Sequence, residues 1–469
     1  MAEQSVSWIP SWMDSAFLVP FALRSGDHEW RGARPGEADW PAVAEGLRRA
    51  QEALREMPVR RIVEAVDAVA EQWAKRDFPP RQRVVRDASV VTGMSEETIN
   101  RSLDGELGTL RAESLLAALE RELGDPEVLD GFRPDAHLRG STRAIGPRTV
   151  LAVFSGNAPG LPARTLVRAL LVKATMIAKI PAREPNFTAA FLRTLHEVEP
   201  VLADSVLATY WDRDDEATMA AALEHADAVI AYGGDEACAA IRAKVGPHQI
   251  YEEHAHKLSF GVVSEDYVSL HGVAEVARRI AVDCSDLDQQ ACLSPQVYLV
   301  TGSQAPAVAR QVARAMRLAA EDCPPGTIDV EDATVLQHRR LVAEWRAAST
   351  ASGEVWSSDG LEWTVVLDDT LLPLSGAGNR VARIVAVPRL ADVVDLVRPY
   401  ARHLQNVALG AVGDEFWRTA EDLALLGVSR VTAPGEMARV SMAWRHDGLP
   451  RISGLLRWCD VEQHPEATT

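Results

Sequence analysis

The chain has 469 residues, of which 47% are hydrophobic and 25% are charged, values typical of a globular protein with two or three domains. Its 49 Lys and Arg residues are outnumbered by 67 Asp and Glu residues, and the net charge of −18 argues against sequence-independent binding to nucleic acid or anionic lipid. No apolar run is long enough to span a membrane, and Met1-Ala-Glu-Gln-Ser5 lacks the basic start of a signal peptide. We therefore expect a cytoplasmic protein whose partners are small molecules or other proteins.

The cysteine and histidine patterns indicate neither a disulfide framework nor a metal site. The cysteines number five and are scattered, without a C-x-x-C pair. His254 and His256 alternate along an expected strand, but no third ligand stands at a recognisable spacing. We therefore expect no metal.

The first part of the chain is expected to cover a larger body. Residues 1–40 are rich in Trp, Pro and Gly and show no period, which is typical of an arm packed over other elements. Between residues 40 and 129 apolar residues recur at steps of three and four, as in Val43, Leu47 and Leu54. This period predicts helices.

From residue 149 the pattern changes to alternating strands and helices. We expect strands at 149–154, 176–180, 205–210 and 228–232, and helices at 162–174, 187–198, 217–225 and 235–245. Such alternation predicts βαβ units on a parallel sheet. Ligands of these sheets bind at the carboxyl ends of the strands.

Two strand-to-helix turns therefore stand where a ligand would bind. In Ser155-Gly-Asn-Ala-Pro-Gly-Leu-Pro162 the glycines allow a tight turn, and Asn157 offers a side-chain amide. In Tyr232-Gly-Gly-Asp-Glu-Ala237 two glycines precede a helix start that is suited to a pyrophosphate. The alternative is a purely structural turn. Gly-Gly-Asp-Glu also occurs in diguanylate cyclases, but a Phe and a strand follow it there, whereas a helix follows here.

A second α/β region follows the extended stretch 249–263. The tail 438–461 alternates and includes Trp444-Arg-His-Asp-Gly448, which predicts a hairpin turn. We assign residues 1–265 to a helical region and a cofactor domain, 266–435 to a catalytic domain, and 436–469 to a terminal hairpin. Exposed terminal hairpins commonly pair subunits, so a homo-oligomer, a dimer or a tetramer, is expected. The alternative is a hairpin that packs on its own domain.

Cys292 is the candidate nucleophile. It ends the polar loop Asp286-Leu-Asp-Gln-Gln-Ala-Cys292 and precedes an apolar strand at 297–300 that Pro295 bounds. A thiol so placed can face a cleft. The alternative is a buried cysteine that acts as a small hydrophobic residue.

The loop with its continuation Leu-Ser-Pro-Gln296 resembles the nucleophile segment of the LuxC-type acyl-CoA reductases, a branch of the aldehyde dehydrogenase superfamily. The resemblance extends from Arg143 to Trp458, with motifs in the superfamily's order. The similar segments are the oxyanion loop 156–162, the lysine strand 177–180, the pyrophosphate turn 232–234, the strand Glu253-His-Ala-His-Lys257 and the nucleophile loop 288–292, joined by Lys257-Leu-Ser-Phe-Gly261 and the terminal Trp-x-His-Asp-Gly.

The resemblance implies an α/β fold of the aldehyde dehydrogenase type, with a Rossmann-type cofactor domain, an α/β catalytic domain, a helical N-terminal region and a C-terminal oligomerisation hairpin. It implies NAD(P)H-dependent reduction of an acyl thioester to an aldehyde through a thioester on the cysteine. The implied catalytic residues are Cys292, Asn157 and Glu253, with Glu252 as a less favoured base. The implied cofactor-binding residues are Ser155, Lys179, Gly233 and Gly234.

NADPH is the expected cofactor, with NADH as the alternative. In the superfamily an acidic residue three positions after the lysine holds the ribose hydroxyls, and this chain has Ala182 there. Glu184 is a competing acid two positions further on. The superfamily's glutamate for the nicotinamide ribose has no match near Pro373-Leu-Ser-Gly-Ala-Gly-Asn379.

The resemblance leaves the acyl donor open between acyl-CoA and an acyl-carrying partner protein. Within enzymes, the alternative is a CoA-acylating aldehyde dehydrogenase that runs in the oxidative direction. From another class, the alternative is a non-reducing acyl-carrier or scaffold subunit, which the missing glutamate favours.

Overall fold

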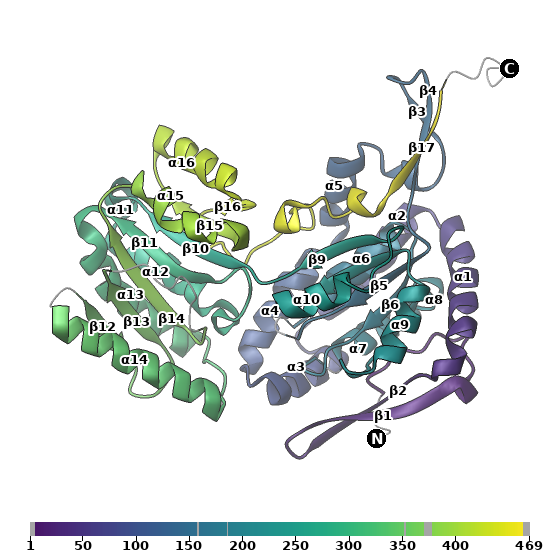
Figure 1. Ribbon diagram of the computed structural model, residues 1–469, viewed down its shortest axis with the longest axis horizontal. Coiled ribbons are helices and arrows are strands. Elements are labelled where there is room, and N and C mark those ends of the chain that lie inside the picture. The colour runs from purple at the N-terminus through teal and green to yellow at the C-terminus, as the bar shows by residue number, and fades with distance from the viewer. Residues whose placement is uncertain (1–4, 157–158, 185, 351–352, 370–377, 463–469) are drawn as a thin grey trace. The chain divides into compact units, whose positions relative to one another are not determined.

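The computed structural model describes residues 5–156, 159–184, 186–350, 353–369 and 378–462. The chain divides into two compact units (Figure 1): unit 1 comprises Met1–Thr92, Ser102–Ala255 and Ser441–Thr469, and unit 2 comprises Gly93–Arg101 and His256–Val440. The sequence placed boundaries at residues 265 and 435. The difference arises because the predicted extended stretch 249–263 is two strands, β9 (Ile250–His254) and β10 (Leu258–Val263), which belong to different sheets.

The N-terminal arm contains a hairpin that the sequence did not predict. Strands β1 (Leu18–Ser25) and β2 (His28–Pro35) pair antiparallel, although their sequences show no apolar alternation and few of their residues are buried. Before them, the backbone N–H of Trp8 donates to the carbonyl of Ala208 at 2.8 Å, and the N–H of Ala208 donates back at 3.0 Å. The arm thus packs on the edge of the main sheet of unit 1.

Five helices follow, as the apolar period predicted. They are α1 (Trp40–Glu56), α2 (Val59–Trp73), α3 (Pro79–Thr92), α4 (Glu96–Gly108) and α5 (Ala112–Leu123). The apolar face of α1 packs Trp40, Val43 and Leu47 against Leu151 and Ile177 of the sheet. Burial of this face, rather than helix propensity alone, holds the helix in place.

The main sheet of unit 1 has five parallel strands in the order β7-β6-β5-β8-β9. Its remaining strands are β5 (Thr149–Val153), β6 (Thr175–Lys179), β7 (Val206–Thr209) and β8 (Ala228–Tyr232), and the connecting helices are α6 (Leu161–Leu171), α7 (Phe187–Val198), α8 (Pro200–Ala203), α9 (Glu216–Glu224) and α10 (Asp235–Arg242). These agree closely with the predicted elements. The chain moves outward from β5 in one direction and from β8 in the other, so the carboxyl ends of these neighbours form a topological switch point, where open α/β sheets bind ligands.

Unit 2 is built on a seven-stranded sheet in the order β12-β13-β14-β11-β10-β15-β16, in which only the edge pair β12 and β13 is antiparallel. Its strands besides β10 are β11 (Pro295–Thr301), β12 (Glu354–Ser357), β13 (Thr364–Asp368), β14 (Val381–Val387), β15 (Leu404–Gly410) and β16 (Arg430–Thr432). Its helices are α11 (Glu265–His271), α12 (Val273–Ser285), α13 (Ala305–Asp322), α14 (Val330–Thr350), α15 (Asp392–Val397) and α16 (Gly413–Leu426). Helices cover both faces, which gives the unit two apolar cores.

The C-terminal strand does not form the predicted hairpin with its own tail. Strand β17 (Arg457–Val461) instead pairs antiparallel with β4 (Gly140–Ile145), which also pairs with β3 (Arg133–Asp135). The residues read as a hairpin turn form a short 3-10 turn, His446–Gly448. Local alternation cannot identify a partner strand so distant in sequence.

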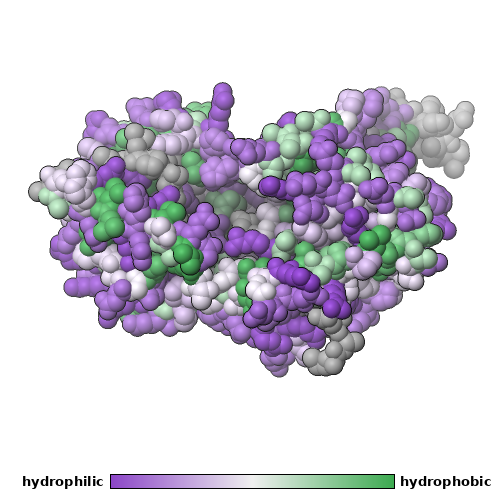
Figure 2. All heavy atoms as spheres, turned by 60° about the horizontal axis from the view of Figure 1, so that its bottom comes forward, coloured by the Kyte–Doolittle hydropathy of each residue, from purple (hydrophilic) through white to green (hydrophobic). Residues whose placement is uncertain are grey.

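The surface agrees with the charged composition. On the face seen in Figure 2, hydrophilic side chains predominate and hydrophobic ones lie in small groups among them. Within the described ranges, no helix combines the length and the apolar character needed to cross a bilayer.

Candidate active site

Cys292 lies in the loop that leads from α12 into β11, as the sequence predicted. The residue is partly exposed, and its carbonyl accepts a 2.7 Å hydrogen bond from the hydroxyl of Ser259 on β10. Ser259 itself is fully buried. This bond ties the thiol-bearing backbone to a central strand of the unit 2 sheet.

The residues before Cys292 form a rigid support with an unusual backbone. Leu287, Asp288 and Gln289 have φ values of 53°, 49° and 61°, a left-handed conformation that costs about 1–3 kcal/mol per non-glycine residue. The Asp288 carboxylate pairs with Arg380 at 2.7 Å. The Gln289 side chain accepts from the N–H of Val381 at 2.7 Å and donates to the carbonyl of Val381 at 2.9 Å. These bonds offset the strain and hold the loop against the start of β14.

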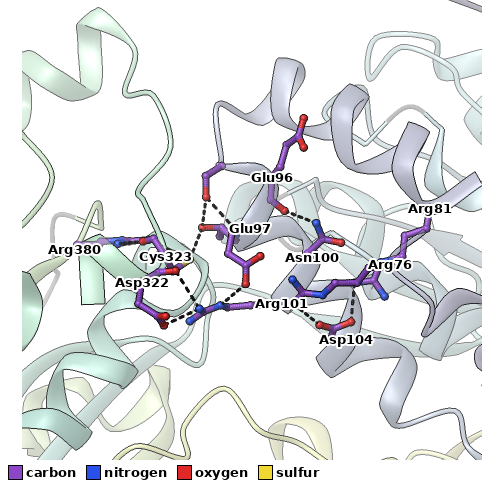
Figure 3. Close-up of polar contacts among 12 residues, drawn as sticks. Arg76, Arg81, Glu96, Glu97, Asn100, Arg101, Asp104, Asp322, Cys323 and Arg380 are labelled. Atoms are coloured by element: carbon purple, nitrogen blue, oxygen red, sulfur yellow. Dashed lines mark hydrogen bonds and ion pairs between the residues drawn. The ribbon is translucent and has the colours of Figure 1, made fainter. Parts of the chain in front are cut away.

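The support extends to the end of α13. Arg380 also donates to the carbonyl of Cys323 at 2.7 Å. In Figure 3, Arg101 reaches both Glu97 and Asp322, with distances of 2.9 and 2.8 Å. The short segment Gly93–Arg101 thereby joins unit 2 beside the residues that hold the Cys292 loop.

The other cysteines differ from Cys292 in burial or in position. Burial raises the pKa of the Cys238 thiol to about 11 and the pKa of Cys284 well above its ordinary value. Cys323 is buried, and Cys459 is exposed on β17. A thiolate is the reactive form, so burial disfavours the reactive form of Cys238 and Cys284. Among the five, Cys292 alone combines partial exposure with a loop at a strand's amino end.

In unit 1 the turn after β5 is fixed on both sides of Asn157, which itself lies outside the described residues. An added Cβ on Gly156 would approach Arg183 Cβ to 2.7 Å, so only glycine fits there. Beyond the undescribed pair, the carbonyl of Pro159 accepts from Ser102 Oγ at 2.8 Å, and the N–H of Gly160 donates to Glu184 at 2.7 Å. Ser155 immediately follows Phe154 at the carboxyl end of β5.

Lys179 ends β6, next to β5. Burial lowers the pKa of its ammonium, against the attraction of Asp212 and Asp215, and the ammonium lies 5.7 Å from the centre of the Trp211 ring. Glu184, the competing acid of the sequence argument, is buried and bonded to Gly160. Burial raises its pKa to about 8. A buried carboxyl that is already engaged is poorly placed to hold ribose hydroxyls.

Gly233 and Gly234 follow β8 and begin α10. Gly234 is the N-cap residue and offers no side-chain cap, so the first N–H groups of the helix have no intrahelical acceptor. A Cβ added to Gly234 would meet nothing within 4 Å. Open backbone of this kind at a switch point suits the close approach of a pyrophosphate.

The two glutamates of β9 point to different partners. Glu253 pairs with Arg242 of α10 at 3.0 Å and keeps 35% of its side chain exposed. Glu252 is buried, and both of its oxygens accept from Arg168 of α6 at 2.6 Å. Burial would raise the pKa of Glu252, but the charges and hydrogen bonds of Arg168 and His254 hold it far below its ordinary range. A carboxylate that is permanently ionised and doubly engaged is a poor general base, which favours Glu253 over Glu252.

The sequence reasoning did not identify the partners of His254. Its Nδ1 lies 2.7 Å from Asp447, and its Nε2 lies 2.9 Å from Glu252. In the sequence, His254 and His256 alternate along an expected strand. In the structure β9 ends at His254, and His256 is exposed in unit 2, so the two histidines do not share a strand. The separation of 193 residues between His254 and Asp447 explains why no local pattern could pair them.

Ligand-type atoms of His254, His446 and Asp447 lie within 4.8 Å of one another. The two imidazole rings are nearly parallel, with 18° between their planes and 4.0 Å between centroids. The lone pairs of the imidazole nitrogens lie in the planes of the rings. Two rings stacked in this way therefore cannot direct their lone pairs at one ion. Both nitrogens of His254 also face carboxylates. This geometry is that of ion pairing rather than of metal ligation.

Comparisons with known proteins identify the family and the fold. Residues 54–458 match the family model described as acyl-CoA reductase (LuxC). The long-chain acyl-protein thioester reductase of Aliivibrio fischeri is 23% identical over 421 residues, which cover 88% of this chain and 84% of that protein.

Solved structures show the same fold. An NAD-dependent benzaldehyde dehydrogenase from Corynebacterium glutamicum matches with a TM-score of 0.71 and 14% identity, over 97% of this chain and 100% of the other. Glyceraldehyde-3-phosphate dehydrogenase GapN from Methanocaldococcus jannaschii, complexed with NADP, matches with a TM-score of 0.67 and 12% identity, over 91% and 94% of the two chains. The fold is therefore the expected aldehyde dehydrogenase fold. With its family model matched over most of its length, the chain belongs to the LuxC family of acyl-CoA reductases and is an oxidoreductase that acts on acyl thioesters.

Proposed function

We propose that this enzyme takes the acyl group of a thioester onto Cys292 and releases it as an aldehyde. The observation that carries the proposal is the partly exposed Cys292 on a loop that the buried Asp288–Arg380 ion pair holds in place. Exchange of one thioester for another forms one C–S bond and breaks another, and the donor leaves as a thiolate. A nicotinamide cofactor, when bound, supplies the hydride that reduces the acyl carbon.

The chain's own groups would hold the reacting carbonyl. We propose that Asn157, by its resemblance to the oxyanion residue of the superfamily, donates to the developing oxyanion together with the backbone N–H of Cys292. One such donor typically contributes about a hundredfold or more to turnover. Support comes from the fixed residues on either side, Gly156 against Arg183 and Gly160 against Glu184.

Glu253 is proposed as the base that activates water when a thioester is hydrolysed. Reduction does not need this step. Its side chain stays 35% exposed beside Arg242, and the complete engagement of Glu252 removes the competing candidate.

Unit 1 is proposed to hold the cofactor and unit 2 the nucleophile. Ser155, Lys179, Gly233 and Gly234 follow or end three adjacent parallel strands, β6, β5 and β8, so their backbones meet at one edge of the sheet. The open backbone of Gly234 and the cation of Lys179 fit a dinucleotide there.

We propose NADPH as the preferred nicotinamide cofactor. Lys179 presents a cation that makes no ion pair with any described carboxylate within 4.0 Å, and Ala182 leaves no acid at the position that opposes a 2′-phosphate. The engagement of Glu184 with Gly160 removes the competing acid.

The donor is proposed to be an acyl-protein thioester, with acyl-CoA as the alternative, because the curated relative named above is an acyl-protein thioester reductase. We also propose that the protein is a homo-oligomer, because β17 leaves an exposed strand at the edge of its small sheet. We propose a cytoplasmic location for it.

The functional test supplies NADPH with either long-chain acyl-CoA or an acylated carrier protein and measures aldehyde by mass spectrometry. Aldehyde from at least one donor supports the proposal, and NADPH oxidation without aldehyde from either donor contradicts it.

A further inference from the structure

A column of aromatic rings crosses the sheet edge at which the cofactor residues lie. Phe154 and Tyr232 stack with centroids 5.9 Å apart, Tyr232 and His254 at 4.5 Å, His254 and His446 at 4.0 Å, and His446 and Trp444 at 4.5 Å. The interplanar angles run from 18° to 34°. The column therefore continues from the sheet into the C-terminal segment of unit 1.

Each sheet residue of the column adjoins a residue of the proposed site. In sequence, Phe154 precedes Ser155, Tyr232 precedes Gly233, and His254 follows Glu253. The N–H of Gly233 also donates to the carbonyl of His254 at 3.2 Å. A shift of His254 would therefore move the glycine turn directly.

The column is held by a chain of buried ion pairs. The carboxylate of Asp447 contacts Nδ1 of His254, and that of Glu252 contacts Nε2. Glu252 in turn forms an ion pair with Arg168. The side chains of His254 and Asp447 are 4% and 6% exposed. Because a carboxylate faces each ring nitrogen, both nitrogens must carry hydrogen, and the ring is an imidazolium.

The charged groups around His254 agree with this protonation state. Burial acts to lower the pKa of His254, but the electrostatic contribution of Tyr232 and the bonds to Asp447 and Glu252 raise it to about 9. The neighbouring His446 stays neutral, because burial and the positive charge of His254 lower its pKa well below the ordinary value. The groups that face this pair are Tyr232 on β8, Glu252 on β9, Arg164 and Arg168 on α6, and Asp447 and Arg451 on the C-terminal segment.

We propose that Asp447 is a positioning residue: through the charged ring of His254 it fixes the carboxyl ends of β8 and β9, and with them the Gly233–Gly234 turn that receives the cofactor. The inference rests on the proposed function for the identity of that ligand. In this proposal the terminal Trp-x-His-Asp-Gly sequence caps the column of rings. This role is separate from any catalytic step.

The first test follows His254 itself. In the full-length protein with ¹³C-labelled histidine, the His254 ring signal is assigned by its loss in His254→Gln and titrated by NMR. The wild-type midpoint is expected near 9, and Asp447→Asn should lower it by about one to three pH units. An ordinary wild-type midpoint, or no change in Asp447→Asn, would overturn the proposal.

The second test measures cofactor binding at one pH below both measured midpoints, where the ring is charged in both proteins, and at one pH between the two midpoints, where it is charged only in the wild type. NADPH binding by Asp447→Asn should match the wild type at the lower pH and be about five- to tenfold weaker at the higher pH. Equal weakening at both pH values would mean that Asp447 only packs the segment, and would overturn the proposal. Asp447→Glu keeps the charge and should bind NADPH equally well at both pH values.

Asp460→Asn is the matched control, because Asp460 lies on β17 of the same segment and accepts a hydrogen bond from the hydroxyl of Thr142 at 2.7 Å. It should change neither titration nor binding. If no variant and no wild-type protein binds a nicotinamide cofactor, the proposed function fails, while the NMR titration still decides whether Asp447 keeps His254 charged.

Discussion

The guanidinium of Arg380 lies 2.7 Å from the carboxylate of Asp288, and the two side chains are only 1% and 6% exposed. This pair connects β14 to the left-handed turn that presents Cys292. Removal of one partner of a buried pair leaves an uncompensated charge, which typically costs about 3–5 kcal/mol.

Arg380→Met should therefore lower the free energy of unfolding of unit 2 by about 3–5 kcal/mol and slow acyl transfer to Cys292, because Asp288 loses the partner that offsets the strained turn. Urea denaturation and stopped-flow acylation measure the two effects. Arg383→Met is the control in β14, three residues after Arg380, since Arg383 pairs with Asp368 at 3.1 Å and not with a residue of the turn. Equal slowing of acylation in the two variants would show that Arg380 has no special role in holding the loop.

The raised pKa of Glu184 should make the free energy of unfolding depend on pH. Its folded pKa of about 8 lies above the ordinary value of 4.5, so between these values the folded state holds a proton that the unfolded state has lost. This group therefore lowers stability as pH rises through that window, by about 1.4 kcal/mol per pH unit at most.

Glu184→Gln keeps an acceptor for Gly160 but cannot ionise, and it should become more stable than the wild type at about pH 8 while matching it at about pH 5. Denaturation curves of both proteins at the two pH values measure the difference. Glu224→Gln, an exposed substitution in the same unit, should leave the difference near zero. A constant difference between Glu184→Gln and the wild type across the window would rule out a raised pKa.

Glu253→Gln should reduce hydrolysis of acyl-CoA more than aldehyde formation, because only hydrolysis needs an activated water. Release of free acid and of aldehyde, measured on the same samples, gives the ratio. Arg242→Gln removes the partner of Glu253 and preserves the carboxylate, so it should retain hydrolysis. Equal loss of both activities in Glu253→Gln would assign Glu253 to acyl transfer instead.

Lys179→Ala should lower kcat/KM for NADPH by about tenfold or more and change that for NADH little. A charge-assisted hydrogen bond to phosphate contributes about 1.5–3 kcal/mol, and about 1.4 kcal/mol is a factor of ten. Lys244→Ala removes the same charge from an exposed pair with Glu216 in unit 1 and should affect neither cofactor. A higher kcat/KM for NADH in the wild type would show the NADPH assignment to be wrong.

Sequence patterns were sufficient where neighbours in sequence carry the signal. The strand and helix periods located β5, β6 and β8, and the turns after them brought Gly233 and Lys179 to one sheet edge. The polar loop before a strand likewise located Cys292.

The supports of the site could not be read in the same way, because their partners are remote in the chain. Arg380 stands 92 residues from Asp288, and Asp447 stands 193 residues from His254. The strand β17 was expected to pair within its own tail, yet it joins β4. Such contacts arise only when the sheets assemble.

Cys292 should carry the acyl group as a thioester before any hydride is transferred. The enzyme is mixed with acyl-CoA in the absence of NADPH, and its peptides are analysed by mass spectrometry, with Cys292→Ala and Cys459→Ala treated in parallel. The expected result is one acyl adduct on Cys292 in the wild type and in Cys459→Ala, with no adduct and no aldehyde formation in Cys292→Ala. An adduct on a different cysteine, or full activity of Cys292→Ala, would contradict the account.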